Sequence, residues 1–95
     1  MTHNLNGNRY ELVYVDTIPG DELGLLCGLC DPPDTKQKKI YIKRDIDLPM
    51  LVDTCIHEAL HACLWCLAED TVETVATDIA RLLIKELGMT QEEVA

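Results

Sequence analysis

The segment His57-Glu58-Ala59-Leu60-His61 carries side chains whose types and spacing could bind a metal ion and activate water. On an α-helix, residues four apart differ by about 40° in azimuth and about 6 Å along the axis, so His57 and His61 point the same way. Two such imidazoles can bind one zinc ion, and the Glu58 carboxylate at the rim of that face can take a proton from metal-bound water. Ala59 and Leu60, between Glu58 and the second histidine, are neither charged nor helix-breaking. The pattern therefore predicts a zinc site on a helix.

A helix is predicted to carry this motif from near Asp47 to about Cys66. Pro49 would lie in its first turn, where the missing N–H of proline costs nothing. Leu60 and Leu64 lie beside the histidine face, and the opposite side is also apolar. We therefore expect a helix that is buried on most sides, with its histidines facing an interior cleft.

A second helix is predicted from near Asp70 to Gly88, because glycine commonly ends a helix. A catalytic zinc usually takes three protein ligands, so the third must come from this helix or its approach. The candidates are the acidic residues Glu69, Asp70, Glu73 and Asp78. A tight helical hairpin would place Asp78 opposite the histidines, whereas Glu73 borders the apolar face of the helix more closely. We favour Glu73, and Asp78 and Glu69 remain alternatives.

Three strands are predicted before the helices, from alternating or strand-forming residues between turn signals. They are Tyr10–Val15, Leu23–Cys30 and Lys39–Lys43. Strands followed by helices indicate an α+β fold. We expect one domain over residues 1–95, a small three-stranded antiparallel sheet packed against two helices, with residues 1–8 and 89–95 flexible.

Together these features resemble the gluzincin type of HExxH zinc metallopeptidase, in particular the minimal ImmA/IrrE-like group found in small phage and bacterial proteins. In that group the third ligand opens a helix with the pattern E-x-x-A-x-x-[apolar]-A-x-x-L-L. The matching residues here are Glu73, Ala76, Ile79, Ala80, Leu82 and Leu83. The resemblance covers residues 39–88 and implies a zincin-like core with zinc bound by His57, His61 and Glu73.

The chain departs from that pattern in two places. Glu73 follows His61 by only 12 positions, fewer than in larger relatives, and Ile84-Lys85 replaces the proline that usually follows the paired leucines. Asp70 to Glu73 also fits a capping box, in which the glutamate hydrogen-bonds back to the start of the helix. Glu73 could therefore act as a helix cap in place of a ligand.

The five cysteines offer a different metal site. The pairs Cys27/Cys30 and Cys63/Cys66 could supply four thiolates to zinc. The second pair is predicted within a helix, where residues three apart diverge, so we expect buried, reduced cysteines that pack as small apolar residues. Trp65 is likewise expected in the core.

Composition restricts location and partners. The chain has 17 acidic and 8 basic residues and a net charge of −9, which argues against a nucleic-acid surface. It contains no apolar run long enough for a membrane span, and its first residues lack the apolar stretch of a signal peptide. An odd number of cysteines disfavours a disulfide framework. We expect a cytoplasmic protein without nucleic-acid or membrane partners.

The resulting hypothesis is a minimal zinc-dependent metallopeptidase that hydrolyses peptide bonds, with Glu58 as the general base. In related zincins the strand before the active helix is an edge strand that pairs with substrate, which here implies Ile40, Tyr41 and Ile42. The substrate would be a protein or peptide whose identity the sequence does not give. The alternative is a non-catalytic, zinc-stabilised protein-interaction module. It is considered because 95 residues leave little room for the second lobe that usually walls a protease cleft.

Overall fold

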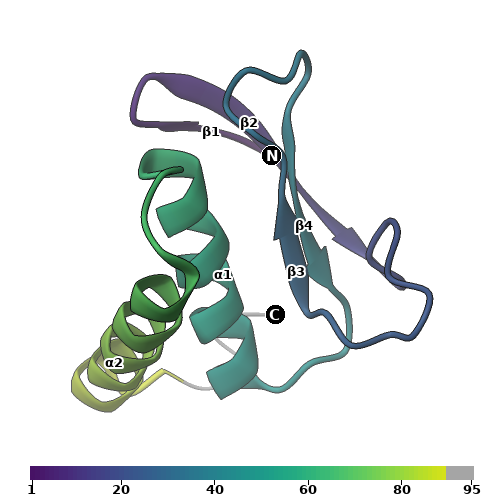
Figure 1. The fold of residues 1–95 in the computed structure, drawn as a ribbon. Helices are drawn as coiled ribbons and strands as arrows, with labels where there is room; N and C mark the ends of the chain where they lie inside the picture. Colours follow the sequence, from purple (N-terminus) through teal and green to yellow (C-terminus); the bar gives the residue numbers. More distant parts are fainter. Residues whose placement is uncertain (90–95) are drawn as a thin grey trace.

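The computed structural model describes residues 1–89 as a twisted sheet with two helices on one side (Figure 1). The strands are β1 (Thr2–Leu5), β2 (Asn8–Val15), β3 (Gly28–Cys30) and β4 (Lys39–Lys43), and the helices are α1 (Leu48–Cys63) and α2 (Glu69–Leu87). The α+β class is therefore confirmed. Residues 90–95, most of the C-terminal segment for which we expected flexibility, lie outside the described residues.

The sheet is mixed, with strand order β1-β2-β4-β3. β1 pairs antiparallel with β2, and β3 pairs antiparallel with β4, but β2 and β4 are parallel, with Leu12 opposite Ile40. The prediction of a three-stranded antiparallel sheet is wrong because the chain does not fold back after β2. Residues 16–27 carry it to the far edge first, and β4 then enters between β2 and β3 in the direction of β2.

The first eight residues contain a strand that the sequence analysis did not predict. Asn6 and Gly7 connect β1 to β2 with φ values of 50° and 80°, and Leu5 lies opposite Asn8. A two-residue Asn-Gly connection with both φ angles positive is a favoured hairpin turn because its twist matches that of the strands. The Asn-Gly pair was therefore the signal that could have identified β1.

The second predicted strand is shorter than expected. Only Gly28–Cys30 pair with β4, whereas the residues before them form turns. The Asp21 carboxylate accepts hydrogen bonds from the backbone N–H groups of Leu25 (3.1 Å) and Leu26 (2.8 Å). Because a side chain takes these donors, the segment forms a local turn in place of a sheet ladder.

The bounds of α1 follow from its caps. Asp47 accepts a hydrogen bond from the Met50 N–H at 3.0 Å, and Pro49 lies in the first turn, as predicted. The helix ends at Cys63 and not at Cys66, since Leu64 has the non-helical angles φ −135° and ψ 62°. The Asn6 side-chain amide donates to the Cys63 carbonyl at 2.7 Å, which satisfies a carbonyl group left free at the helix end.

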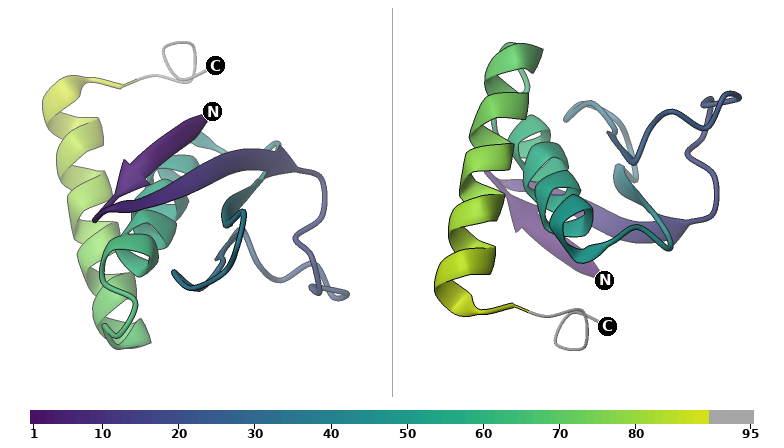
Figure 2. Two further views of the ribbon diagram at one scale, coloured as in Figure 1. Left: turned by 90° about the horizontal axis from the view of Figure 1, so that it is seen from above. Right: turned by 90° about the horizontal axis from the view of Figure 1, so that it is seen from below.

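The helices form two successive layers on one face of the sheet (Figures 1 and 2). α1 packs against the sheet over a core of Tyr10, Cys30, Ile40, Ile42 and Ala62. α2 packs against the other side of α1, where Leu48 and Val52 meet Ala80. It ends as predicted at Gly88, which has a left-handed conformation. No helix within residues 1–89 is long and apolar enough to cross a membrane.

The bond between Asn6 and α1 can be tested by Asn6→Gly, which keeps the positive φ but removes the amide donor. We expect the free energy of unfolding to fall by about 0.5–1.5 kcal/mol, the usual contribution of one hydrogen bond. Denaturant unfolding measures this change. Gln37→Gly is the matched control, because Gln37 also has a positive φ (52°) but its side chain makes no hydrogen bond within residues 1–89. Equal effects of both changes would show that the amide does not stabilise α1.

Candidate metal centre

His57, His61 and Glu69 bring three potential metal ligands together where α1 and α2 meet. The Nε2 atoms of the two histidines lie 3.1 Å apart. One Glu69 oxygen lies 2.8 Å from the His57 Nε2 atom, and the other lies 2.9 Å from the His61 Nε2 atom. The ligand atoms all fall within 4.8 Å of one another, so this group could hold a metal ion.

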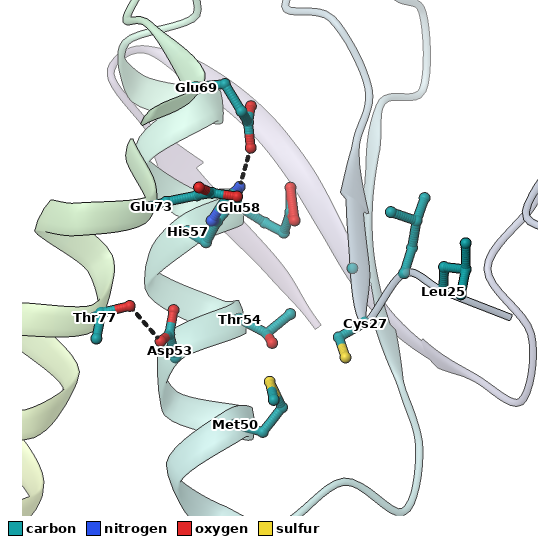
Figure 3. A pocket seen from close by; sticks show the side chains of 12 residues that line it. Leu25, Cys27, Met50, Asp53, Thr54, His57, Glu58, Glu69, Glu73 and Thr77 are labelled. Carbon is teal, nitrogen blue, oxygen red and sulfur yellow. Dashed lines mark hydrogen bonds and ion pairs between the residues drawn. The ribbon is translucent and has the colours of Figure 1, made fainter. Parts of the chain in front are cut away.

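The register of the two helices explains why these residues converge. The Asp53 carboxylate on α1 accepts a hydrogen bond from the Thr77 hydroxyl on α2 at 2.8 Å (Figure 3). In an antiparallel pair, moving one turn along each helix from this contact reaches His57 and Glu73, and a second turn reaches His61 and Glu69. Both glutamates therefore lie on the histidine side of α2, and Glu69 reaches both imidazoles.

The predicted third ligand, Glu73, is not a member of this group within residues 1–89. It lines the cavity beside His57 (Figure 3), while Glu69, an alternative in the sequence analysis, meets the histidines. Asp78 is exposed and outside the group. The early end of α1 accounts for the difference, because the helical hairpin turns several residues before the position that would have set Asp78 opposite the histidines.

The capping alternative for Glu73 is also not formed. The N-cap of α2 is Ala68, and the Val72 N–H donates to the Ala68 carbonyl at 3.0 Å. Asp70 therefore lies inside the first turn, where its carboxylate accepts from the Thr71 N–H at 2.9 Å. A capping box needs its first residue at the N-cap, so the pattern from Asp70 to Glu73 does not fulfil that role.

Glu58 lies next to the metal-binding group but is buried, with 6% of its surface exposed. Its carboxylate has no hydrogen bond or ion pair within residues 1–89, and it is not sealed from solvent, because Glu58 lines both neighbouring cavities and no fully buried side-chain oxygen in this range lacks a partner. Burial raises the pKa of Glu58 to about 7; the neighbouring charge of His57 lowers this pKa and that of Glu69 raises it. The site therefore contains a carboxylate that is not fixed by a partner, beside the candidate ligands.

A close approach of β3 to α1 encloses Glu58. A Cβ atom added to Gly28 would lie 2.7 Å from the Thr54 methyl carbon and 2.9 Å from both Cγ and Oε2 of Glu58. These distances are shorter than van der Waals contact, so only glycine lets the strand backbone pass this close to the helix. The sequence analysis did not single out Gly28, because the need for glycine here depends on the helix that packs against the strand.

Two cavities meet at the metal-binding group. One, of about 410 Å³, includes Asp53, Thr54, Glu73 and Met50 in its lining; the other, of about 500 Å³, includes Leu29, Cys30, Trp65 and Leu67. The residues common to both are Leu26, Gly28, His57, Glu58 and Glu69. The metal-binding group thus lies between a cavity with several carboxylates and a mainly apolar one.

The predicted substrate-binding strand is not at the edge of the sheet. β4 lies between β2 and β3, so it cannot pair with a peptide. Ile40 and Ile42 are 2% and 0% exposed because they face α1 in the core. The edge strand beside Glu58 is β3, which within residues 1–89 pairs with β4 alone.

Trp65 was expected in the core, but it is 42% exposed. Because α1 ends at Cys63, Trp65 falls in the turn between the helices, where its ring meets the His61 ring edge-on with 6.1 Å between centroids.

No cysteine joins a metal-binding group in residues 1–89. Cys66 is exposed, whereas Cys30 is buried. The four-cysteine site is therefore not formed. The expectation of buried cysteines is confirmed for Cys30 alone, because Cys27, Cys55 and Cys63 are only partly buried and Cys66 is exposed.

No protein-family model, characterised protein or solved structure matches this chain. The comparisons therefore identify no family. The resemblance to ImmA/IrrE-like proteins rests on the quoted motif residues. The structure itself shows an α+β fold and a His57, His61 and Glu69 group that could hold a metal ion.

The contact at Gly28 predicts that Gly28→Ala lowers the free energy of unfolding by about 1–3 kcal/mol, the range for an overpacked core. Denaturant unfolding would measure the loss. Thr54→Ser removes the nearest methyl group while keeping the hydroxyl. In the double variant we expect a total loss smaller than the sum of the two single losses, because the new methyl group occupies the space left by the old one. Strict additivity would contradict the close approach of β3 to α1.

Proposed function

We propose that this protein is a zinc-dependent metallopeptidase. The observation that carries the proposal is the convergence of the His57, His61 and Glu69 side chains beside the buried carboxylate of Glu58. A site that only stabilised the fold would have no use for a largely buried carboxylate that faces the cavities beside the ligands, because withdrawing a carboxylate from water costs free energy. A hydrolytic site requires such a group as a base.

The side chains present suit zinc. Two histidines and one glutamate are a ligand set of catalytic zinc sites. With metal–ligand bonds of 2.0–2.1 Å, ligand atoms around a tetrahedral zinc lie about 3.3 Å apart. The two imidazole nitrogens lie 3.1 Å apart, close to this spacing. The contacts of 2.8 and 2.9 Å involve different Glu69 oxygens, so zinc bound through one oxygen would require the carboxylate to move within a group whose ligand atoms lie within 4.8 Å of one another.

A bound zinc ion would supply Lewis acidity, which polarises a carbonyl group and lowers the pKa of water. Glu58 would accept a proton from the attacking water at its carboxylate and donate that proton to the departing amine. Gly28 and Thr54 would hold the Glu58 side chain against the helix.

The free edge of β3 is the natural place for an extended peptide in this proposal. A peptide that added a strand there would satisfy the exposed backbone groups of β3 and run past Glu58. The substrate role predicted for residues 40–42 thus moves to residues 28–30. The short length of β3 implies that the adjacent cavities supply much of the remaining contact.

The ligand assignment predicts that purified protein binds zinc and that His57→Ala or His61→Ala abolishes binding. Glu69→Ala should weaken zinc affinity by more than about 100-fold, because loss of an outer-shell partner alone costs 10–100-fold. Glu73→Ala is the matched control on the same face of α2, and its affinity should be nearly unchanged. Competition with a chromogenic chelator measures each affinity. If Glu73→Ala releases zinc while Glu69→Ala retains it, Glu73 is the ligand.

The mechanism predicts that Glu58→Gln keeps its zinc and fold but loses peptide hydrolysis by a factor of about 10²–10⁴, the contribution of a general base. Cleavage of an unstructured protein substrate, with metal analysis of the same samples, measures both properties. Equal activity of the two proteins would exclude Glu58 as the base. A wild type that binds zinc but cleaves no peptide would favour the alternative, a zinc-stabilised interaction module.

A further inference from the structure

The two cavities beside the metal-binding group differ in chemical character. The cavity of about 410 Å³ contains Asp53 and Glu73 in addition to Glu58 and Glu69, and no lysine or arginine within residues 1–89 lines it. In the described part of the chain, the cavity of about 500 Å³ has no carboxylate in its lining beyond Glu58 and Glu69, which it shares with the first. A ligand that spans the centre would therefore meet negative charge on one side and apolar surface on the other.

The carboxylates of the acidic cavity are available to a ligand. Asp53 is half-buried and accepts one hydrogen bond, from Thr77, which fixes its orientation and leaves acceptor capacity free (Figure 3). Glu73 is exposed on α2 at the His57 side of the cavity. Neither belongs to the group of His57, His61 and Glu69. The two carboxylates make this cavity suited to a cationic side chain.

The apolar cavity has an aromatic wall. Trp65 contacts His61 at its edge and is 42% exposed, and Leu29 and Leu67 complete the apolar lining. Leu26 borders both cavities. Its backbone N–H donates a hydrogen bond to the Asp21 carboxylate at 2.8 Å, which holds Leu26 in place. A large apolar side chain of a ligand would cover surface that is otherwise exposed to water.

We propose that the substrates of this site are peptides with a lysine or arginine on one side of the cleaved bond and a large apolar residue on the other. The inference rests on the proposed function, since both cavities flank the group assigned to hydrolysis. Asp53 and Glu73 would select the basic residue, and Trp65 and Leu67 would select the apolar residue. Glu58, Glu69 and the histidines would face the bond between them.

Peptide binding to the Glu58→Gln protein in zinc-containing buffer tests the proposal without cleavage. The probes are fluorescein-labelled, blocked tetrapeptides whose central residues are lysine and leucine, glutamate and leucine, or lysine and glycine, each in both orders. Fluorescence anisotropy gives the affinities. In one of the two orders, the lysine–leucine peptide should bind at least about tenfold more tightly than either of the other two. Its advantage over the glutamate peptide should fall at high salt.

Charge-neutral variants assign the preference to each cavity. Asp53→Asn or Glu73→Gln, added to the Glu58→Gln protein, should reduce the preference for lysine over glutamate, and Trp65→Ala should reduce that for leucine over glycine. Asp78→Asn is the control, because Asp78 is an exposed carboxylate of α2 that lines neither cavity. Equal affinity for all the peptides, or an equal effect of Asp78→Asn and Asp53→Asn, would overturn the proposal.

The same peptides separate this proposal from the proposed function. If the wild type cleaves them without regard to charge or apolar size, the metallopeptidase proposal stands and the specificity proposal is wrong. If the Glu58→Gln protein binds them selectively but the zinc-loaded wild type leaves them intact, the recognition by the two cavities stands and hydrolysis is wrong.

Discussion

The antiparallel register of α1 and α2 is the constraint on which the candidate site depends. His57 and His61 lie on one face of α1 irrespective of the position of α2, but a carboxylate of α2 meets them only in one axial register of the two helices. The hydrogen bond between Asp53 and Thr77 fixes that register, together with the packing of Val52 and Leu48 on Ala80. A shift of one turn would bring Glu73 to the place now held by Glu69.

The approach of the sheet to α1 controls the chemistry of Glu58. β3 passes so close that Gly28 faces the Glu58 side chain without a Cβ between them. Water is thereby excluded from much of the carboxylate, and its pKa rises to about 7. Because burial disfavours the charged form of the carboxylate, this arrangement lowers the stability of the fold at pH values where Glu58 is ionised.

The short chain builds its cleft from few elements. α1 supplies the histidines and Glu58, the start of α2 supplies Glu69, and β3 with the preceding turn supplies the opposite wall. The net charge of −9 is consistent with the carboxylates that gather on one side of this cleft. The turn between the helices places Trp65 on the other side, so the early end of α1 contributes to the chemical difference between the two cavities.

The sequence alone determined the local features. Four predictions depend on residues close together in the chain, whose periodicity and turn chemistry can be read directly. They are the α+β class, the start of α1 near Asp47, the end of α2 at Gly88 and the shared face of His57 and His61. The hairpin turn at Asn6-Gly7 is also a feature set by neighbouring residues, although the sequence analysis did not predict it.

Only the tertiary structure decided which distant residues meet. Glu69 in place of Glu73, the internal position of β4 and the contact of Gly28 with Glu58 all depend on how elements far apart in the sequence dock. The sequence pattern of a strand does not show whether the strand lies at the edge or in the centre of a sheet. The pattern of an amphipathic helix likewise does not specify its register against a neighbouring helix. The packing of side chains and a few long-range hydrogen bonds, such as those of Asn6 and Asp53, settle both questions.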